Sequence, residues 1–390
     1  MRGFFYYLAQ RFMRLAGRIY FALLAFILYI PNWTVIDLKG AQWLNMSILN
    51  ALFIGYILLF SRSESEKHLK NPILLSFSAL FLISSISSLY AINPVESIVK
   101  LSDLFTILST IFVCFYFISH KAVKLIYLLS IVLITLSIDL TGSYYQYFSI
   151  LGFTEFNFEY SNSLRGFYGN KNMGAIALMM KLPLALLLIT LSKNKLLKYY
   201  LYLISIATFY MILLQSSRAA FLGILLCLIL LALLFLIKNY YFKIRSINEL
   251  RSFKIFILPI FIAFILFKFT VNQNDPVAVE YRVSSIINNA DDQSSTIRLR
   301  FYKQAISYIS TNPFLGCGIG NWRIMAVKMD SENMFSYVVP GFVHNDLLEI
   351  FAETGIFGFL AYLSFFFFIF KINLENILMW MKSKMDYTAI

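Results

Sequence analysis

The chain alternates between long apolar runs and short polar connections, with one long polar stretch near its C-terminal end. The hydrocarbon core of a bilayer is about 30 Å thick, so a helix needs roughly 20 mostly apolar residues to cross it. About ten runs approach this length, at residues 19–33, 43–60, 73–92, 97–119, 123–145, 172–192, 197–215, 219–237, 255–269 and 350–370. A backbone in lipid must satisfy its own hydrogen bonds, so we expect every run to be an α-helix. The pattern predicts an all-α, polytopic transmembrane protein.

The long polar stretch divides the chain into four expected parts. These are N-terminal transmembrane helices over 1–145, central transmembrane helices with an outer loop over 146–270, the polar loop over 271–345, and a last transmembrane helix with a short tail over 346–390. A loop this long is functional by default. Within it, residues 296–310 place apolar side chains at helical spacing with basic residues between them, which predicts an amphipathic helix.

Composition and charge support the membrane assignment. Hydrophobic residues make up 59% of the chain and charged residues only 14%, and a soluble domain cannot bury that much apolar surface. The formal net charge of +13 fits the cytoplasmic excess of Lys and Arg in membrane proteins, so we expect no nucleic-acid partner. Three cysteines without a CxxC pair indicate neither a disulfide framework nor a metal site.

Basic residues also set the expected orientation. With the N-terminus inside, Lys and Arg gather in the inner segments and no span has to be reversed. The loops at residues 146–171, 216–218 and 271–345 then face outward, and both termini are cytoplasmic. Four arginines precede the first apolar run, without a small-residue cleavage site, which favours a retained span over a removed signal peptide.

His344 is the only histidine that this orientation places outside, because His68 and His120 fall in inner loops. A histidine can accept a proton near neutral pH, as a general base must. The alternative is a polar residue at a helix start. Asn345 and Asp346 are natural N-cap residues, so capping can explain part of this motif.

Two outer arginines precede apolar runs. Arg218 lies in a turn between two spans, where it is either a snorkelling interfacial anchor or a ligand for phosphate oxygens. Arg165 precedes a segment with two glycines, in which Asn170 and Asn172 can bind a hydroxyl-rich ligand or cap the helix that begins near Met173.

Inside the spans, Lys181 is expected to face either an aqueous cavity or a carboxylate such as Asp139. The chain contains no HExxH, Walker or CxxC sequence, and the outer acidic residues are scattered. Chemistry that uses arginine for phosphate and histidine as base, with no metal and no cofactor, fits these residues best.

Four motifs in this order resemble the O-antigen ligase and polymerase superfamily of bacterial envelope glycosyltransferases. They are residues 166–172 (GFYGNKN), 217–219 (SRA), 298–302 (RLRFY) followed by 312–318 (NPFLGCG), and 344–355 (HNDLLEIFAETG). The resemblance covers residues 165–370, and the order of the motifs is more specific than any one of them.

The resemblance implies a GT-C-like membrane fold with a long periplasmic loop. It also implies transfer of a glycan from undecaprenyl diphosphate to an acceptor hydroxyl outside the bacterial inner membrane. Carried onto matching positions, Arg218 and Arg298 hold the diphosphate and His344 activates the acceptor. Arg300 competes with Arg298, but the family's aromatic residue four positions later matches Tyr302 only for Arg298. We expect further substrate contacts from Arg165, Asn170, Asn172, Arg300 and Asn345.

Two departures from the family pattern leave the acceptor open. Tyr302 stands where the family commonly has Trp, and the chain has about ten spans where ligases often have about twelve. O-antigen ligation to lipid A-core, metal-independent and inverting, is the favoured reaction. Polymerisation of O-units on the lipid carrier and transfer to a protein are the alternatives within the class. A transporter of lipid-linked glycans is the alternative from another class, and it predicts inverted repeats and broken helices.

Overall fold

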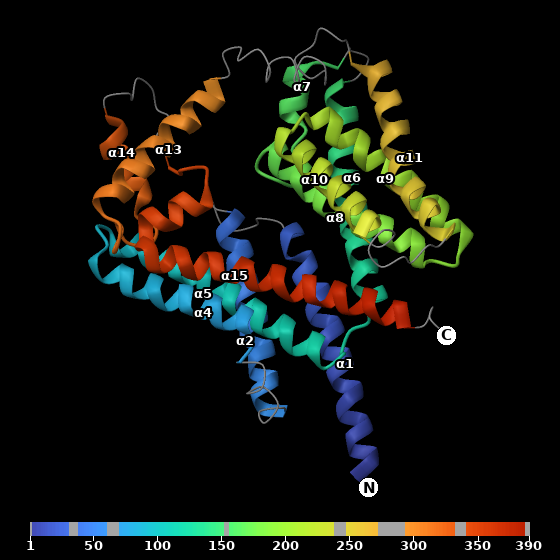
Figure 1. Ribbon diagram of the computed structural model, residues 1–390, viewed down its shortest axis with the longest axis horizontal. Helices are drawn as coiled ribbons and strands as arrows, with labels where there is room; N and C mark the ends of the chain where they lie inside the picture. Colours follow the sequence, from blue (N-terminus) through green and yellow to red (C-terminus); the bar gives the residue numbers. More distant parts are fainter. Residues whose placement is uncertain are drawn as a thin grey trace. The chain divides into compact units, whose positions relative to one another are not determined.

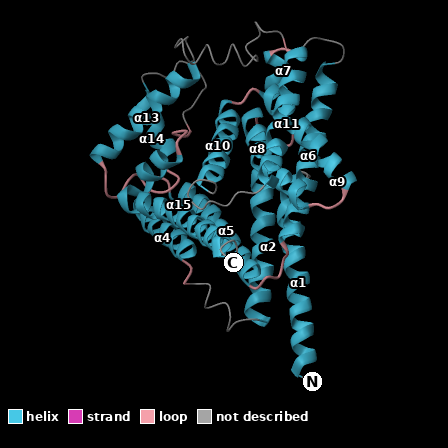
Figure 2. Ribbon diagram, turned by 45° about the vertical axis from the view of Figure 1, so that its right-hand side comes forward, coloured by secondary structure: helices cyan, strands magenta, loops and turns pink. Residues whose placement is uncertain are grey.

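The computed structural model describes residues 2–30, 38–60, 70–151, 156–237, 247–271, 293–331 and 341–386, and these residues are helical almost throughout (Figures 1 and 2). The described helices are α1 (Arg2–Phe26), α2 (Leu38–Phe60), α4 (Pro72–Ser87), α5 (Pro94–Ser119), α6 (Leu125–Leu151), α7 (Phe158–Ser163), α8 (Lys171–Leu191), α9 (Lys195–Gln215), α10 (Arg218–Leu236), α11 (Ile247–Thr270), α13 (Gln293–Thr311), α14 (Trp322–Asp330) and α15 (Asp346–Asp386), with the 3-10 turns η1 (Ile27–Tyr29) and η2 (Ser88–Tyr90). Within these ranges the only β-type pairing is a single bridge between Phe156 and Val271. The all-α prediction is confirmed.

Eight of the described helical segments are long and apolar enough to cross a membrane. They are Gln10–Tyr29, Gly40–Phe60, Pro72–Tyr90, Pro94–Ser119, Leu125–Ser149, Lys171–Leu191, Lys195–Gln215 and Asp346–Trp380. The other two expected spans fall on α10 and α11, whose described apolar stretches, Arg218–Leu234 and Ile257–Thr270, are shorter. The chain is a polytopic helical membrane protein.

Asparagine side chains define where several of these helices begin. Asn71, Asn93, Asn170 and Asn194 are the N-caps of α4, α5, α8 and α9, and each side-chain oxygen accepts a hydrogen bond from a backbone N–H in the first turn. These bonds satisfy donors that the helix itself leaves unpaired. In α4 and α5 a proline follows the cap, where its missing N–H costs nothing.

The contacts group the chain into two compact units, which is a division by packing and not by membrane topology. The first unit comprises residues 1–20, 31–122 and 291–377. In it α5 packs against α2 and α4, and α13 packs against α14. The amphipathic helix expected over residues 296–310 is confirmed as α13, which ends at Thr311, just before Asn312 and Pro313.

A glycine-rich turn at residues 316–320 fixes α15 within the first unit. The N–H groups of Cys317 and Gly318 donate to the carbonyl oxygens of Ala352 and Glu353, both at 2.9 Å. Gly316 has a φ of +69°, and a Cβ there would come within 2.6 Å of the Ala352 carbonyl oxygen. Only glycine allows this close backbone approach. The glycine run therefore allows tight backbone packing against α15.

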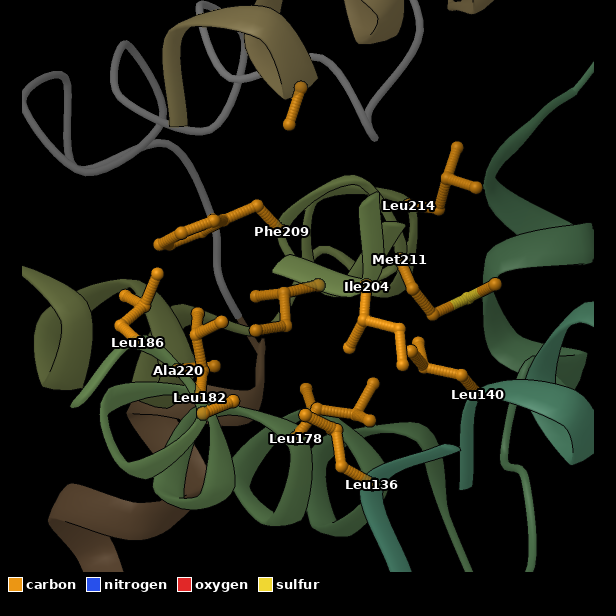
Figure 3. Packing of buried hydrophobic residues seen from close by; sticks show 14 of the residues in the cluster. Leu136, Leu140, Leu178, Leu182, Leu186, Ile204, Phe209, Met211, Leu214 and Ala220 are labelled. Atoms are coloured by element: carbon orange, nitrogen blue, oxygen red, sulfur yellow. The ribbon is translucent and has the colours of Figure 1, made fainter. Parts of the chain in front are cut away.

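The second unit comprises residues 21–30, 123–290 and 378–390. Helix α8 packs against α6, α9, α10 and α11. Figure 3 shows side chains of this core, among them Leu178 and Leu182 from α8, Ile204 and Met211 from α9, and Leu136 from α6. In lipid, close van der Waals packing of this kind is a main source of helix association, so this core gives the loops at the helix ends a rigid base.

Candidate functional site

His344 lies directly before α15 and contacts α13 in the first unit. The hydroxyl of Tyr302 donates a hydrogen bond to the His344 carbonyl oxygen at 3.2 Å. The imidazole stacks on the ring of Phe301, with the ring centroids 6.1 Å apart and the planes 20° from parallel. Arg298, Phe301 and Tyr302 are spaced i, i+3 and i+4, so they share one face of α13. The side chain of His344 therefore lies on the face of α13 that carries Arg298.

The surroundings of His344 favour a neutral imidazole. The pKa of His344 is lowered from its usual value of 6.5, first by partial burial of the ring and then by the positive charge of Arg298. Both effects disfavour the charged form of a histidine. A neutral imidazole has a free nitrogen that can accept a proton, so His344 is in the state that a general base needs at neutral pH.

Arg298 and Arg300 have different surroundings although only one residue separates them. Arg300 Nη2 donates to Asp330 Oδ2 at 3.0 Å, and Gln304 Nε2 donates to Asp330 Oδ1 at 2.7 Å. Asp330 is buried, with 3% of its side chain exposed. The guanidinium of Arg300 thus joins α13 to α14, whereas Arg298 is exposed and acts electrostatically on His344.

In the second unit, the Arg218 turn and the Arg165 segment lie together. Ser216, in the left-handed conformation with φ 49°, ends α9, and Arg218 begins α10. The buried Gln215 donates from Nε2 to the Leu164 carbonyl oxygen at 3.0 Å. A Cβ added at Gly174 would lie 3.0 Å from the Arg165 carbonyl oxygen and 3.1 Å from Gln215 Nε2. These two atoms therefore occupy the space beside the glycine. The two arginine-bearing segments therefore meet at the same end of α8.

Three asparagines expected to bind substrate also have helix-start positions. Asn170 Oδ1 accepts from the Met173 N–H at 3.0 Å, so capping is confirmed for Asn170. Asn345 Oδ1 accepts from two N–H groups in the first turn of α15, at 3.1 and 3.3 Å. Asn172 is exposed in the first turn of α8. Arg165 is exposed as well, and its Nε donates to the Asn162 carbonyl oxygen at 3.2 Å.

Of the two surroundings expected for Lys181, an aqueous cavity or a carboxylate such as Asp139, the structure shows the carboxylate. Lys181 Nζ lies 2.5 Å from Asp139 Oδ2, and 1% of the Asp139 side chain is exposed. The hydroxyls of Tyr29 and Tyr168 donate to the two Asp139 oxygens at 2.8 and 3.1 Å. Sequence reasoning missed these tyrosines because hydrophobic runs full of aromatic residues do not indicate which hydroxyl meets a buried acid.

Sequence reasoning also missed Gln146 and Gln215, which contact the Arg165 segment through its backbone. The sequence does single out both glutamines, because each is an uncharged polar residue at the end of a long apolar run. Over the described part of the chain, no group of three or more His, Cys, Asp or Glu side chains is placed to hold a metal ion.

The site residues thus form two groups, one around Arg298 and His344 and one around Arg165 and Arg218, each within a single unit. Residues 203–363 match a family model described as O-antigen ligase. The matched region includes Arg218, Arg298 and His344. No curated protein sequence and no solved structure matches the chain. Residues 203–363 of the chain are therefore similar to the O-antigen ligase family.

Proposed function

We propose that this protein transfers a glycan from undecaprenyl diphosphate to an acceptor hydroxyl on the periplasmic side of the bacterial inner membrane, with lipid A-core as the acceptor. The observation that carries the proposal is the pairing of an exposed arginine, Arg298, with a histidine whose environment keeps it neutral, His344, within the family region. The excess of Lys and Arg in the inner segments supports an orientation in which both termini are cytoplasmic. All candidate site residues then lie on the periplasmic side.

The reaction needs one base and an anion-binding group. His344 takes the proton from the acceptor hydroxyl as that oxygen attacks the anomeric carbon of the donor glycan. The bond from the anomeric carbon to the diphosphate oxygen breaks on the opposite face, so the configuration inverts and the electron pair leaves with the lipid diphosphate. Arg218 and Arg298 are the candidates for offsetting the charge that grows on this leaving group. A preorganised donor of this kind contributes about 10²–10³ in rate.

The remaining polar residues have supporting roles in this proposal. Arg165 and Asn172 are exposed beside the Arg218 turn and are available for the diphosphate or the first sugars. Asn170 and Asn345 act through the helix starts that they cap. Arg300 contributes to stability, because its bond to Asp330 joins α13 to α14.

The test uses the purified chain in lipid with undecaprenyl diphosphate-linked glycan and lipid A-core. We expect glycan on lipid A-core, a loss of at least a hundredfold in rate with Arg218→Ala or His344→Ala, and little change with Lys303→Ala. Lys303 is a matched control because it is an exposed basic residue of α13 with no assigned role. Unimpaired transfer by both site variants would exclude this mechanism.

The product also separates the alternatives. Longer glycan on the lipid carrier would assign the same chemistry to an O-unit polymerase, and glycan on a protein would assign it to a protein O-oligosaccharyltransferase. Movement of the lipid-linked glycan across the membrane without any new glycosidic bond would assign a transporter.

A further inference from the structure

Four residues on one face of α6 contact the segment that carries Arg165. Asp139, Gly142, Ser143 and Gln146 are spaced i, i+3, i+4 and i+7, so they lie in one row along the helix. Here these four residues are called the α6 strip, and residues 164–168 are called the arginine loop. Read from Gln146 to Asp139, the strip contacts the loop from Arg165 to Tyr168.

At one end of the strip, Gln146 binds the loop backbone with both ends of its amide. Its Oε1 accepts from the N–H groups of Arg165 and Gly166 at 2.9 and 2.8 Å, and its Nε2 donates to the Gly166 carbonyl oxygen at 3.0 Å. One side chain thus bonds three backbone groups of the loop. Their fixed geometry sets the backbone from which the Arg165 side chain extends.

In the middle of the strip, small residues allow close packing. A Cβ at Gly142 would come within 2.5 Å of the Phe167 ring, so the ring lies directly on the glycine. The same ring meets Tyr29 edge-on, with the centroids 5.3 Å apart. Beside it, Gly166 has a φ of +60°, and Ser143 Oγ lies 2.9 Å from where its Cβ would be. The loop has no space to shift along α6.

At the other end, Asp139 accepts the Tyr168 hydroxyl at 3.1 Å. The ion pair with Lys181 supplies the opposite charge that a buried carboxylate requires. Hydrogen bonds to a charged acceptor are stronger than those between neutral groups. Asp139 is therefore a firm attachment point for the C-terminal end of the arginine loop.

The loop is held from a second side by the turn that carries Arg218. Gln215, three residues before Arg218, donates to the Leu164 carbonyl oxygen. The backbone of Arg165 packs on Gly174 of α8 next to the same glutamine. The α6 strip and Gln215 thus hold the loop between α6 and the end of α9.

We infer that Gln146, Asp139 and Tyr168 are positioning residues that hold the Arg165 backbone beside the Arg218 turn in the conformation that binds the donor diphosphate. The inference rests on the proposed function, since it assigns the diphosphate of that reaction to this end of the second unit. A loop held in its binding conformation loses less conformational entropy when the ligand binds, which increases affinity.

The experiment compares Tyr168→Phe and Gln146→Leu with a matched control, Tyr144→Phe. Tyr144 lies on α6, as Gln146 does, and its hydroxyl donates to the Ala207 carbonyl oxygen at 2.9 Å. The control therefore removes a hydrogen-bonded tyrosine hydroxyl, as Tyr168→Phe does, but one that bonds α9 and not the loop. Affinity for undecaprenyl diphosphate alone is measured in detergent, and the KM values for donor and acceptor are measured in the transfer assay. Hydrogen exchange of the peptide covering the arginine loop reports its order.

We expect weaker binding of undecaprenyl diphosphate and a higher donor KM, by about tenfold for Tyr168→Phe and more for Gln146→Leu. The acceptor KM stays unchanged, loop exchange is faster in both variants, and the control behaves like the wild-type protein. Faster loop exchange with unchanged affinity for undecaprenyl diphosphate would overturn the inference. An equal effect on both KM values would also overturn it, because it would show a structural role only. Absence of transfer by a wild-type protein that binds undecaprenyl diphosphate would instead contradict the proposed function.

Discussion

Replacing Arg300 and Arg298 separately, each with Met, should give opposite results. Arg300 Nη2 and Asp330 Oδ2 are 3.0 Å apart, and two unit charges at that distance attract by about 5–6 kcal/mol at an effective dielectric constant of about 20. Solvent screens much of this, because 39% of the Arg300 side chain is exposed. Exposed pairs contribute about 0.2–1 kcal/mol, whereas breaking a buried pair costs about 3–5 kcal/mol. With only Asp330 buried, we expect Arg300→Met to lower the free energy of unfolding by about 2 kcal/mol.

The assay combines denaturant unfolding in detergent with transfer kinetics below the unfolding transition. Arg300→Met should lose stability but keep most of its rate, and Asp330→Asn in the same chain should restore part of the stability by removing the unpaired charge. Arg298→Met should keep its stability and lose about a hundredfold in rate, as removal of a preorganised donor does. The assignment of Arg300 to stability and Arg298 to the transfer reaction would be refuted by the reverse result. In that result, Arg300→Met is fully stable but inactive, and Arg298→Met is active.

Three further predictions concern His344, Gly355 and metals. The acidic limb of the kcat/KM profile against pH should lie below pH 6.5, because burial and Arg298 lower the pKa of His344. Arg298→Gln removes a positive charge near His344. The pKa of His344 should then rise, and the acidic limb should move to higher pH. Gly355→Ala should destabilise the protein by several kcal/mol and reduce its folded yield on gel filtration, because Gly355 has a φ of +66° and a Cβ would overlap the Phe314 carbonyl. EDTA should leave the transfer rate unchanged, since arginines carry the leaving-group charge in the proposed reaction; an EDTA-sensitive rate restored by a divalent cation would contradict this.

The class of the protein and its amphipathic loop helix could be predicted because both depend on local patterns. The length of an apolar run decides whether it spans a bilayer, and helical spacing near Arg298 predicts α13 without knowledge of its neighbours. The cap at Asn170 could be predicted for the same reason, since its partner lies three residues away.

The contacts of Gln146 and Gln215 with the arginine loop could not be predicted, because their partners are backbone groups. Gln146 and Gln215 bind N–H and C=O groups of residues 164–166, and every residue offers such groups whatever its identity. The sequence likewise gives Arg298 and Arg300 the same chemistry, and only the fold shows that Asp330, distant in the chain, pairs with one of them.

The backbone of His344 bears on the design of inactive variants for structural studies. His344 has a φ of +60°, in the left-handed region, and Tyr302 holds its carbonyl oxygen there. Asparagine adopts this region readily, whereas alanine is strained in it. His344→Asn should therefore remove the base while preserving the local chain, which makes it the variant of choice for capturing the donor and acceptor together before transfer.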